Sequence, residues 1–144
     1  MTSRPRRMRP PLEFPLRLPE SGLPVRVGGA YLSRLWGVDY RAIARWADVG
    51  LIEARRDGDG WRYYYREAVE AFAQAATPVR SLRPGMRIRH PKWVDGVPCR
   101  VVEVSLDEEL WRIGLATSGG RLAYAPPCSG ERIVLLVPPE TGES

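Results

Sequence analysis

The apolar residues of this chain change their spacing once, near residue 78. From residue 30 to residue 76 they recur every three or four positions, as on one face of a helix, whereas after Ser81 they form short alternating or valine-rich runs. Pro78 and the pair Pro84-Gly85 lie at the change, and both interrupt regular structure. The spacing therefore predicts an α+β chain in which a helical part precedes a β part.

The helical part is predicted to contain three short helices and one β-hairpin. Gly37 and Gly50 end the first two helices, Asp39 is a suitable N-cap for the second, and Asp-Gly pairs mark the hairpin turn. The predicted elements are a helix over 30–36, a helix over 40–50, a hairpin around 57–60 and a helix over about 66–76. Their order is the layout of a winged helix-turn-helix.

The motifs in this part carry a closer resemblance than the layout alone. Gly37-Val38 joins the first two helices, Trp46 closes the second, and Val69-Glu70-Ala71-Phe72 lies in the third. The other matching positions are Tyr31, Leu32, Leu35, Ile43, Gly50-Leu51 and Tyr64. The set resembles the MerR-like excisionase family, and over about a third of the chain it implies a DNA-binding domain.

The β part is predicted to contain five short strands separated by turn residues. The strands are expected over 86–90, 97–105, 110–115, 121–125 and 132–137. Short strands with turns at such close spacing indicate a small barrel. The opening run from Leu82 to Ile88, with a second strand through Gly96 to Val104, resembles SH3-like barrels of the KOW and Tudor kind. The predicted fold is thus an N-terminal winged helix-turn-helix followed by a small five-stranded SH3-like β-barrel.

Charge and proline content set the N-terminal segment apart from the rest. The chain has a net charge of +5, of which residues 1–26 carry six Arg and two Glu. Six prolines lie within residues 1–24, so this segment is predicted to be a disordered arm. Its arginines, Arg6 and Arg7 among them, indicate contact with a nucleic-acid backbone or minor groove, and a solvated leader is the alternative. The predicted domains are 1–24, 25–78, 79–138 and a tail over 139–144.

The second helix carries the residues expected to read DNA. Its outward positions near the N-terminus are Tyr40, Arg41, Ala44 and Arg45, and an arginine can bind guanine O6 and N7 with two hydrogen bonds. A solvated helix face is the alternative, because Asp39, Asp48 and Glu53 are available to pair with the same arginines.

The hairpin is expected to contact the DNA backbone. Arg55 and Arg56 precede its turn, and Trp61 and Arg62 follow it. Acidic residues at the tip, Asp57 and Asp59, would repel phosphate, so the contacts are expected from the strands.

Nothing in the sequence indicates catalysis, a metal or a cofactor. The two cysteines, Cys99 and Cys128, are far apart, and His90 is the only histidine. No apolar run reaches the roughly 18 residues that a membrane span needs, and a soluble cytoplasmic protein is expected. Double-stranded DNA is the expected partner.

Two function classes follow from these features. The first is a sequence-specific DNA-binding protein, an excisionase-like architectural factor or transcription regulator without enzymatic activity. The second is an interaction adaptor whose barrel binds RNA polymerase or a recombinase, or an assembly component of a virion that reuses the helix-turn-helix. Residues 80–138 carry nine basic and six acidic residues, which suits self-association or a protein partner. The two parts are expected to fold separately, with DNA binding in residues 25–78.

Overall fold

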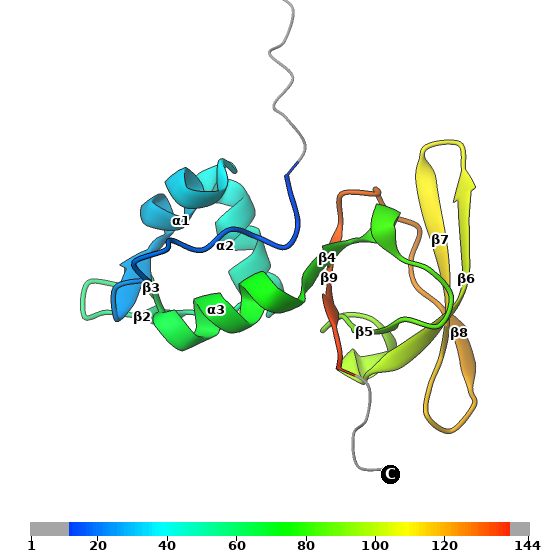
Figure 1. Ribbon diagram of the computed structural model, residues 1–144. Coiled ribbons are helices and arrows are strands. Elements are labelled where there is room, and N and C mark those ends of the chain that lie inside the picture. Colours follow the sequence, from blue (N-terminus) through cyan, green and yellow to red (C-terminus); the bar gives the residue numbers. More distant parts are fainter. Residues whose placement is uncertain (1–11, 139–144) are drawn as a thin grey trace, which may run out of the picture.

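The structure, a computed structural model, describes residues 12–138 and is mixed α+β (Figure 1). Its helices are α1 (Gly29–Trp36), α2 (Tyr40–Val49) and α3 (Arg66–Ala75). Its strands are β1 (Arg26–Gly28), β2 (Arg55–Arg56), β3 (Arg62–Tyr65), β4 (Ala76–Pro78), β5 (Arg87–Arg89), β6 (Cys99–Asp107), β7 (Leu110–Ala116), β8 (Leu122–Tyr124) and β9 (Ile133–Leu136). Two short 3-10 helices, Val79–Ser81 and Val94–Gly96, lie between strands.

The three predicted helices and the hairpin are confirmed to within a few residues. Helix α2 begins after Asp39, whose carboxylate accepts a hydrogen bond from the Arg41 amide at 2.8 Å. Helices α1 and α2 end at Gly37 and Gly50, which have φ of 68° and 97°. Such left-handed conformations suit glycine, and they bring each helix to a sharp end.

A three-stranded antiparallel sheet of order β1-β3-β2 lies beside the helices. Strand β1 was not predicted, because Pro24 and Gly28-Gly29 flank it and favour a turn, and the strand forms through its pairing with the distant β3. Val27 of β1 is paired with Tyr64 of β3, and both side chains are buried beneath the helices. We call residues 12–75 the helical unit.

The second sheet has six antiparallel strands in the order β4-β9-β5-β6-β7-β8, and it is not a closed barrel. The five predicted strands correspond to β5 to β9, so their prediction is confirmed. The predicted small barrel has five strands, whereas the sheet has six: the additional strand, β4, pairs with β9 at one edge, and β8 forms the other edge. We call residues 76–138 the sheet unit.

The helical and sheet units share a strand junction and part of a core. Helix α3 ends at Ala75 and β4 begins at Ala76, so no loop separates them (Figure 1). Ile133 and Leu135 of β9 belong to the apolar cluster of the helices, which includes Leu32, Ile43 and Phe72. A second cluster, around Val101 and Ile113, lies within the sheet unit. A domain boundary after Pro78 therefore places β4 in one domain and its pairing partner β9 in the other.

The prediction of a disordered arm over residues 1–24 is wrong for residues 12–24. This segment lies along the helices as extended chain, with Leu16 and Leu23 buried in the first cluster (Figure 1). The indole Nε1 of Trp36 donates a hydrogen bond of 2.8 Å to the carbonyl oxygen of Arg17. Prolines exclude a helix here but not packing, because leucines in an extended chain still bury apolar area. Residues 1–11 and 139–144 lie outside the described residues.

Candidate nucleic-acid interface

The outward face of α2 presents the side chains that the sequence predicted to read DNA. Ile43 is fully buried and Trp46 packs against Phe72, with ring centroids 5.1 Å apart, so this side of α2 is turned toward the core. Tyr40, Arg41 and Arg45 are exposed on other sides of the helix. Because Arg41 and Arg45 are four residues apart, their side chains emerge one turn from each other. The sequence placed both correctly with respect to the core.

The side chains of Arg41 and Arg45 have no hydrogen-bond or ion-pair partner within residues 12–138. Each acid that was available to neutralise them is engaged elsewhere. Asp39 caps α2, Asp48 pairs with Arg62, and Glu53 lies 3.7 Å from Arg55. Within the described residues, neither guanidinium forms an ion pair with a carboxylate.

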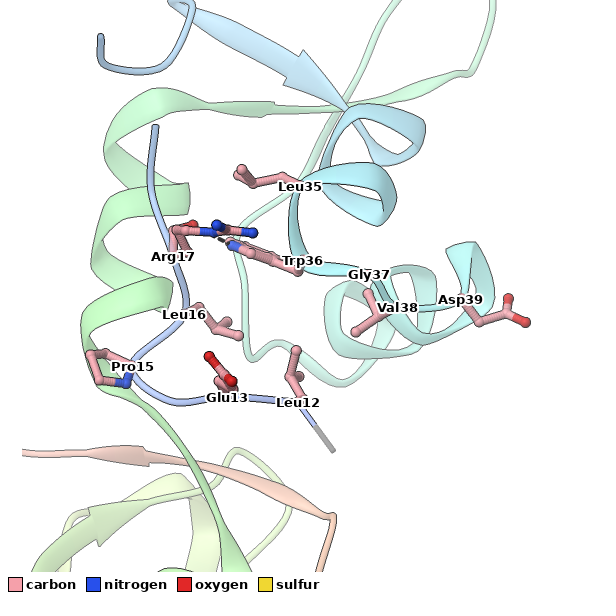
Figure 2. Close-up of a pocket in the computed structure, with 10 residues that line it drawn as sticks. All are labelled: Leu12, Glu13, Pro15, Leu16, Arg17, Leu35, Trp36, Gly37, Val38 and Asp39. Carbon is pink, nitrogen blue, oxygen red and sulfur yellow. Dashed lines mark hydrogen bonds between the residues drawn. The ribbon is translucent and has the colours of Figure 1, made fainter. Parts of the chain in front are cut away.

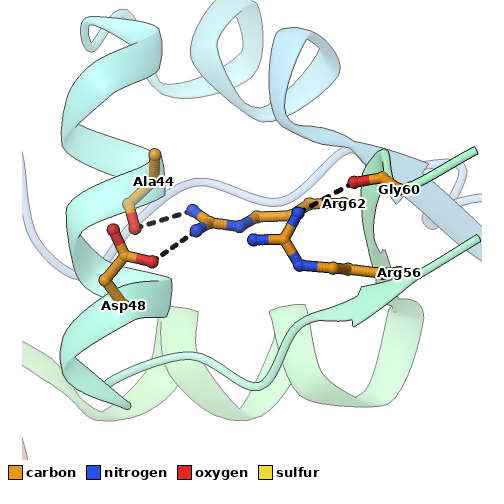
Figure 3. Close-up of polar contacts among 5 residues, drawn as sticks. All are labelled: Ala44, Asp48, Arg56, Gly60 and Arg62. Carbon is orange, nitrogen blue, oxygen red and sulfur yellow. Dashed lines mark hydrogen bonds and ion pairs between the residues drawn. The ribbon is translucent and has the colours of Figure 1, made fainter.

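Arg62 fastens the hairpin to α2. Its guanidinium donates a hydrogen bond of 3.0 Å to the carbonyl oxygen of Ala44 and forms an ion pair with the carboxylate of Asp48 (Figure 3). Only 20% of the Arg62 side chain is exposed. The sequence predicted a backbone contact for Arg62, but local patterns cannot show that Asp48, fourteen residues earlier, lies opposite it. This internal role was missed.

The hairpin turn is held by hydrogen bonds of Asp57, one of the two acidic residues expected to repel phosphate, and of Arg56. The Asp57 carboxylate accepts from the amides of Asp59 at 2.9 Å and Trp61 at 3.0 Å. Arg56 donates to the carbonyl oxygen of Gly60 at 2.8 Å (Figure 3). The indole of Trp61 is 68% exposed, so it projects from an ordered turn rather than joining the core. The hairpin thus offers an aromatic ring and the exposed Arg55 and Arg56.

Cation and aromatic side chains alternate over the three-stranded sheet. The guanidinium of Arg26 lies 4.9 Å from the ring centroid of Tyr63, and that of Arg55 lies 5.6 Å from the ring centroid of Tyr65. The two tyrosine rings meet edge to face at 5.5 Å. Arg26 was missed because its strand was missed. The contacts hold Arg55 on the sheet while leaving its guanidinium accessible.

A small residue at the start of α1 allows Tyr40 to pack beside it. A Cβ atom at Gly29 would lie 2.8 Å from Cε2 of Tyr40, so a larger residue there would displace the ring. Tyr40 remains 47% exposed. Its ring therefore lies at the seam between α1 and α2, next to the exposed arginines of α2.

The N-terminal segment and the turn between α1 and α2 enclose a cleft of about 500 Å³ (Figure 2). One wall is formed by Leu12, Glu13 and Pro15 to Arg17, and the other by Leu35 to Asp39. The described chain thus starts beside the N-terminal end of α2. Arg6 and Arg7, predicted to contact nucleic acid, lie outside the described residues.

Three titratable side chains of the sheet unit are buried: His90, Cys99 and Cys128. Burial lowers the pKa of His90 to about 4, and the nearby Arg132, Arg89 and Lys92 contribute to this shift. Nδ1 of His90 accepts the Lys92 amide at 3.0 Å, and the ring stacks on Trp93. Burial also raises the pKa of both cysteine thiols, Cys99 and Cys128. Within residues 12–138 no three His, Cys, Asp or Glu side chains are grouped as metal ligands.

Three comparisons complete the description of the site. The chain matches no protein-family model, no curated protein and no solved structure. In the part that the structure describes, no helix is long and apolar enough to cross a bilayer.

Proposed function

We propose that residues 25–78 form a winged helix-turn-helix of the MerR-like excisionase type that binds duplex DNA with sequence preference. Helix α2 would enter the major groove, and the β2–β3 hairpin would lie along the backbone as the wing. One observation carries the proposal: the side chains of Arg41 and Arg45 on the outward face of α2 have no hydrogen-bond or ion-pair partner within residues 12–138. An exposed pair of arginines whose neighbouring acids are engaged elsewhere is suited to an external anion.

The spacing of the two arginines fits the geometry of base recognition. Four residues along a helix span about 6 Å, close to two base-pair steps. Each guanidinium can bind O6 and N7 of a guanine with two parallel hydrogen bonds. We therefore expect the preferred site to contain guanines read by Arg41 and Arg45, with Tyr40 beside them at the edge of the groove.

In this proposal the wing positions the domain on the backbone. Arg55, Arg56 and Trp61 are exposed and would contact phosphate or sugar. Arg62 would act as a positioning residue, because its guanidinium already holds β3 against α2. This contact would set the angle between the wing and the helix in the groove.

A reader of about 50 residues touches few base pairs, so tight binding requires an additional contact. The arginines of the N-terminal arm, Arg6 and Arg7, would provide sequence-independent contacts with phosphate. An architectural factor that binds next to other copies, or a transcription regulator, fits this requirement. We propose no catalytic role.

A second candidate function is a protein-interaction adaptor. The observation that favours it is the edge strand β8, where Leu122 is 70% exposed and Tyr124 is 65% exposed. Both lie on one side of a strand whose outer edge is unpaired within the described sheet, and such an edge can accept another strand. The partner would be a second copy of this chain, RNA polymerase, a recombinase or a virion component.

Selection of bound duplexes from a random pool tests the first proposal. Enrichment of one guanine-containing motif, with log K falling steeply against log salt, is expected for the full chain. The double variant Arg41→Ala, Arg45→Ala should lose the enriched motif while retaining weak, salt-sensitive binding. Failure of the full chain to retain any duplex at low salt would contradict DNA binding and favour the adaptor.

A further inference from the structure

The face of the three-stranded sheet that is turned away from the helices carries a row of aromatic side chains. Successive side chains of a strand point to opposite faces, and Tyr64 of β3 is buried beneath the helices, so Tyr63 and Tyr65 extend from the other face. Trp61 has the same parity. Its carbonyl oxygen accepts a hydrogen bond from the Asp57 amide at 3.0 Å, which continues the pairing of β2 with β3 in the same register. We call Trp61, Tyr63 and Tyr65 the aromatic row.

The aromatic row is accessible from solvent. Trp61 is 68% exposed, and Tyr63 and Tyr65 are partly exposed. Gly28 of β1 is the register partner of Tyr63 and has no side chain. A Cβ atom at Gly28 would meet no heavy atom of a non-neighbouring residue within 4 Å. The space beside Tyr63 on the β1 side is therefore open.

Two arginines flank the aromatic row, one on each neighbouring strand. The guanidinium of Arg26 in β1 lies 4.9 Å from the ring centroid of Tyr63, and that of Arg55 in β2 lies 5.6 Å from the ring centroid of Tyr65. A guanidinium that contacts a ring through its face keeps the N–H groups in its plane free for an anion. The side chain of Arg26 has no hydrogen-bond or ion-pair partner within residues 12–138.

One carboxylate lies beside the flanking arginines. Glu53 is 3.7 Å from Arg55, and the two side chains are 67% and 55% exposed. An ion pair with this exposure contributes little, so a phosphate can replace the carboxylate. Arg26, Arg55 and Glu53 together carry a net positive charge, which is complementary to a phosphate backbone.

The spacing of the aromatic row fits a single strand of nucleic acid. Side chains two positions apart in a strand are separated by about 6.7 Å, twice the roughly 3.4 Å between stacked bases. Successive bases of an extended strand can therefore stack on successive rings. In a duplex the neighbouring base pairs cover the faces of each base, so a single strand is the form that offers them. An acidic peptide would pair with the arginines but would leave the rings without planar partners.

We infer that the aromatic row, together with Arg26 and Arg55, binds single-stranded DNA, with bases on the rings and phosphates on the guanidiniums. Aromatic residues on an open sheet face are a common platform for single strands. The choice of DNA over RNA rests on the proposed function, because the same hairpin would lie along a duplex. The ring contacts use neither arginine of α2 and carry no sequence preference. The protein would thus hold a strand that is opened beside its duplex site.

Fluorescence anisotropy of the full-length protein with a labelled oligothymidylate of about 12 nucleotides tests the inference, because this sequence forms no duplex. The double variant Tyr63→Leu, Tyr65→Leu should weaken binding at least about tenfold, as the loss of two stacked bases predicts. Tyr63→Phe, Tyr65→Phe keeps both rings and should bind as the parent does. Tyr124→Leu is the matched control, since it removes an exposed tyrosine from β8 and should leave the affinity unchanged.

A crosslink locates the strand on the parent protein, without any substitution. Ultraviolet irradiation of the full chain with an oligodeoxynucleotide that contains 5-iodouracil, followed by peptide mass spectrometry, should identify a residue of the aromatic row. Crosslinks found in α2 or the sheet unit and absent from the aromatic row would overturn the inference.

Four binding results would also overturn it. The first is no retention of oligothymidylate at low salt. The second is an equal loss of affinity in the leucine double variant and in Tyr124→Leu, and the third is a phenylalanine variant as weak as the leucine variant. The fourth is tenfold tighter binding of oligouridylate, which would assign the surface to RNA.

The arginines of α2 separate this inference from the proposed function. The double variant Arg41→Ala, Arg45→Ala should lose the selected duplex and retain oligothymidylate, whereas the leucine double variant at Tyr63 and Tyr65 should retain the enriched duplex motif. An equal loss of oligothymidylate in both double variants would assign single-strand binding to α2 and overturn the inference. A full chain that binds oligothymidylate but no duplex would end the proposed reading of duplex DNA and leave the aromatic row assigned.

Discussion

Arg62 and Asp48 connect the two structural elements that would face DNA. The guanidinium of Arg62 in β3 also donates to the carbonyl oxygen of Ala44, so the hairpin is bound to both the backbone and a side chain of α2. The contact is polar and mostly covered on the arginine side, whereas Asp48 is exposed. The contact therefore contributes modestly to the free energy of unfolding, but it fixes the position of the hairpin relative to α2.

We predict that Arg62→Met lowers the free energy of unfolding by about 1 kcal/mol, since it removes a hydrogen bond and a partly exposed ion pair. Urea denaturation measures this change. Arg45→Met, which removes an exposed arginine without a described partner, should change stability by less than about 0.5 kcal/mol. Equal effects of the two substitutions would show that Arg62 makes no stabilising contact with α2.

Arg41→Ala and Arg45→Ala should each weaken binding to a selected duplex by about 1 to 3 kcal/mol, as the loss of a contact with a base edge predicts. Binding to an unrelated duplex should change much less. Fluorescence anisotropy at one fixed salt concentration measures both. Arg112→Ala provides the control for loss of a positive charge outside α2. Unchanged affinity of both α2 variants for the selected site would contradict groove reading by this helix.

Two tryptophans should differ sharply in their effect on stability. Trp46→Ala should cost about 3 kcal/mol, because the ring packs against Phe72 and Trp36 and its removal leaves a cavity. Trp61→Ala should cost less than about 0.5 kcal/mol, because the side chain is largely exposed. Thermal or urea unfolding checks the pair. A larger effect at Trp61 would mean that α2 and the hairpin are oriented differently.

Stability should fall as the pH is lowered through the range in which His90 titrates. Its pKa is lowered to about 4 in the folded chain, mainly by burial, against about 6.5 when unfolded. Between these values the unfolded chain binds the additional proton, so the stabilisation is complete above pH 6.5 and is lost toward pH 4. At pH 5 the loss attributable to His90 is about 2 kcal/mol relative to pH 7.5.

His90→Phe tests this assignment because it keeps a ring against Trp93 and cannot be protonated. Urea unfolding at pH 7.5 and pH 5 should show a smaller difference for the variant than for the parent. The same dependence in both proteins would assign the acid sensitivity to carboxylates instead.

The described chain should unfold in one cooperative transition, since Ile133 and Leu135 of β9 belong to the core of the helices. Calorimetry of residues 12–138 should show a single peak. A fragment ending at Pro78 loses β9 and should be markedly less stable than the helical unit in the whole chain. Two resolved transitions, or a fragment of undiminished stability, would support two separately folding parts.

Local patterns predicted the elements well and the long-range contacts poorly. Asp39 and Gly50 mark the ends of α2 because capping depends on neighbours in sequence. Strands β1 and β4 were missed because each forms through its pairing with a strand that is distant in sequence, β3 or β9. The same limit explains Arg62: no residue close in sequence indicates that its partners lie on α2. The exposed arginines Arg41 and Arg45 were predictable, because helical periodicity alone separates them from Ile43.

Because α3 ends at Ala75 and β4 begins at Ala76, the helical unit and the sheet unit are rigidly connected. A junction without a loop leaves few torsions that can turn independently, and the pairing of β4 with β9 takes up most of those. Any force applied to the sheet unit is therefore transmitted to α3 and, through the shared core, to the helices packed on it. The orientation of the sheet unit relative to the helices is thus set by the α3–β4 junction together with the shared core, and not by a flexible linker.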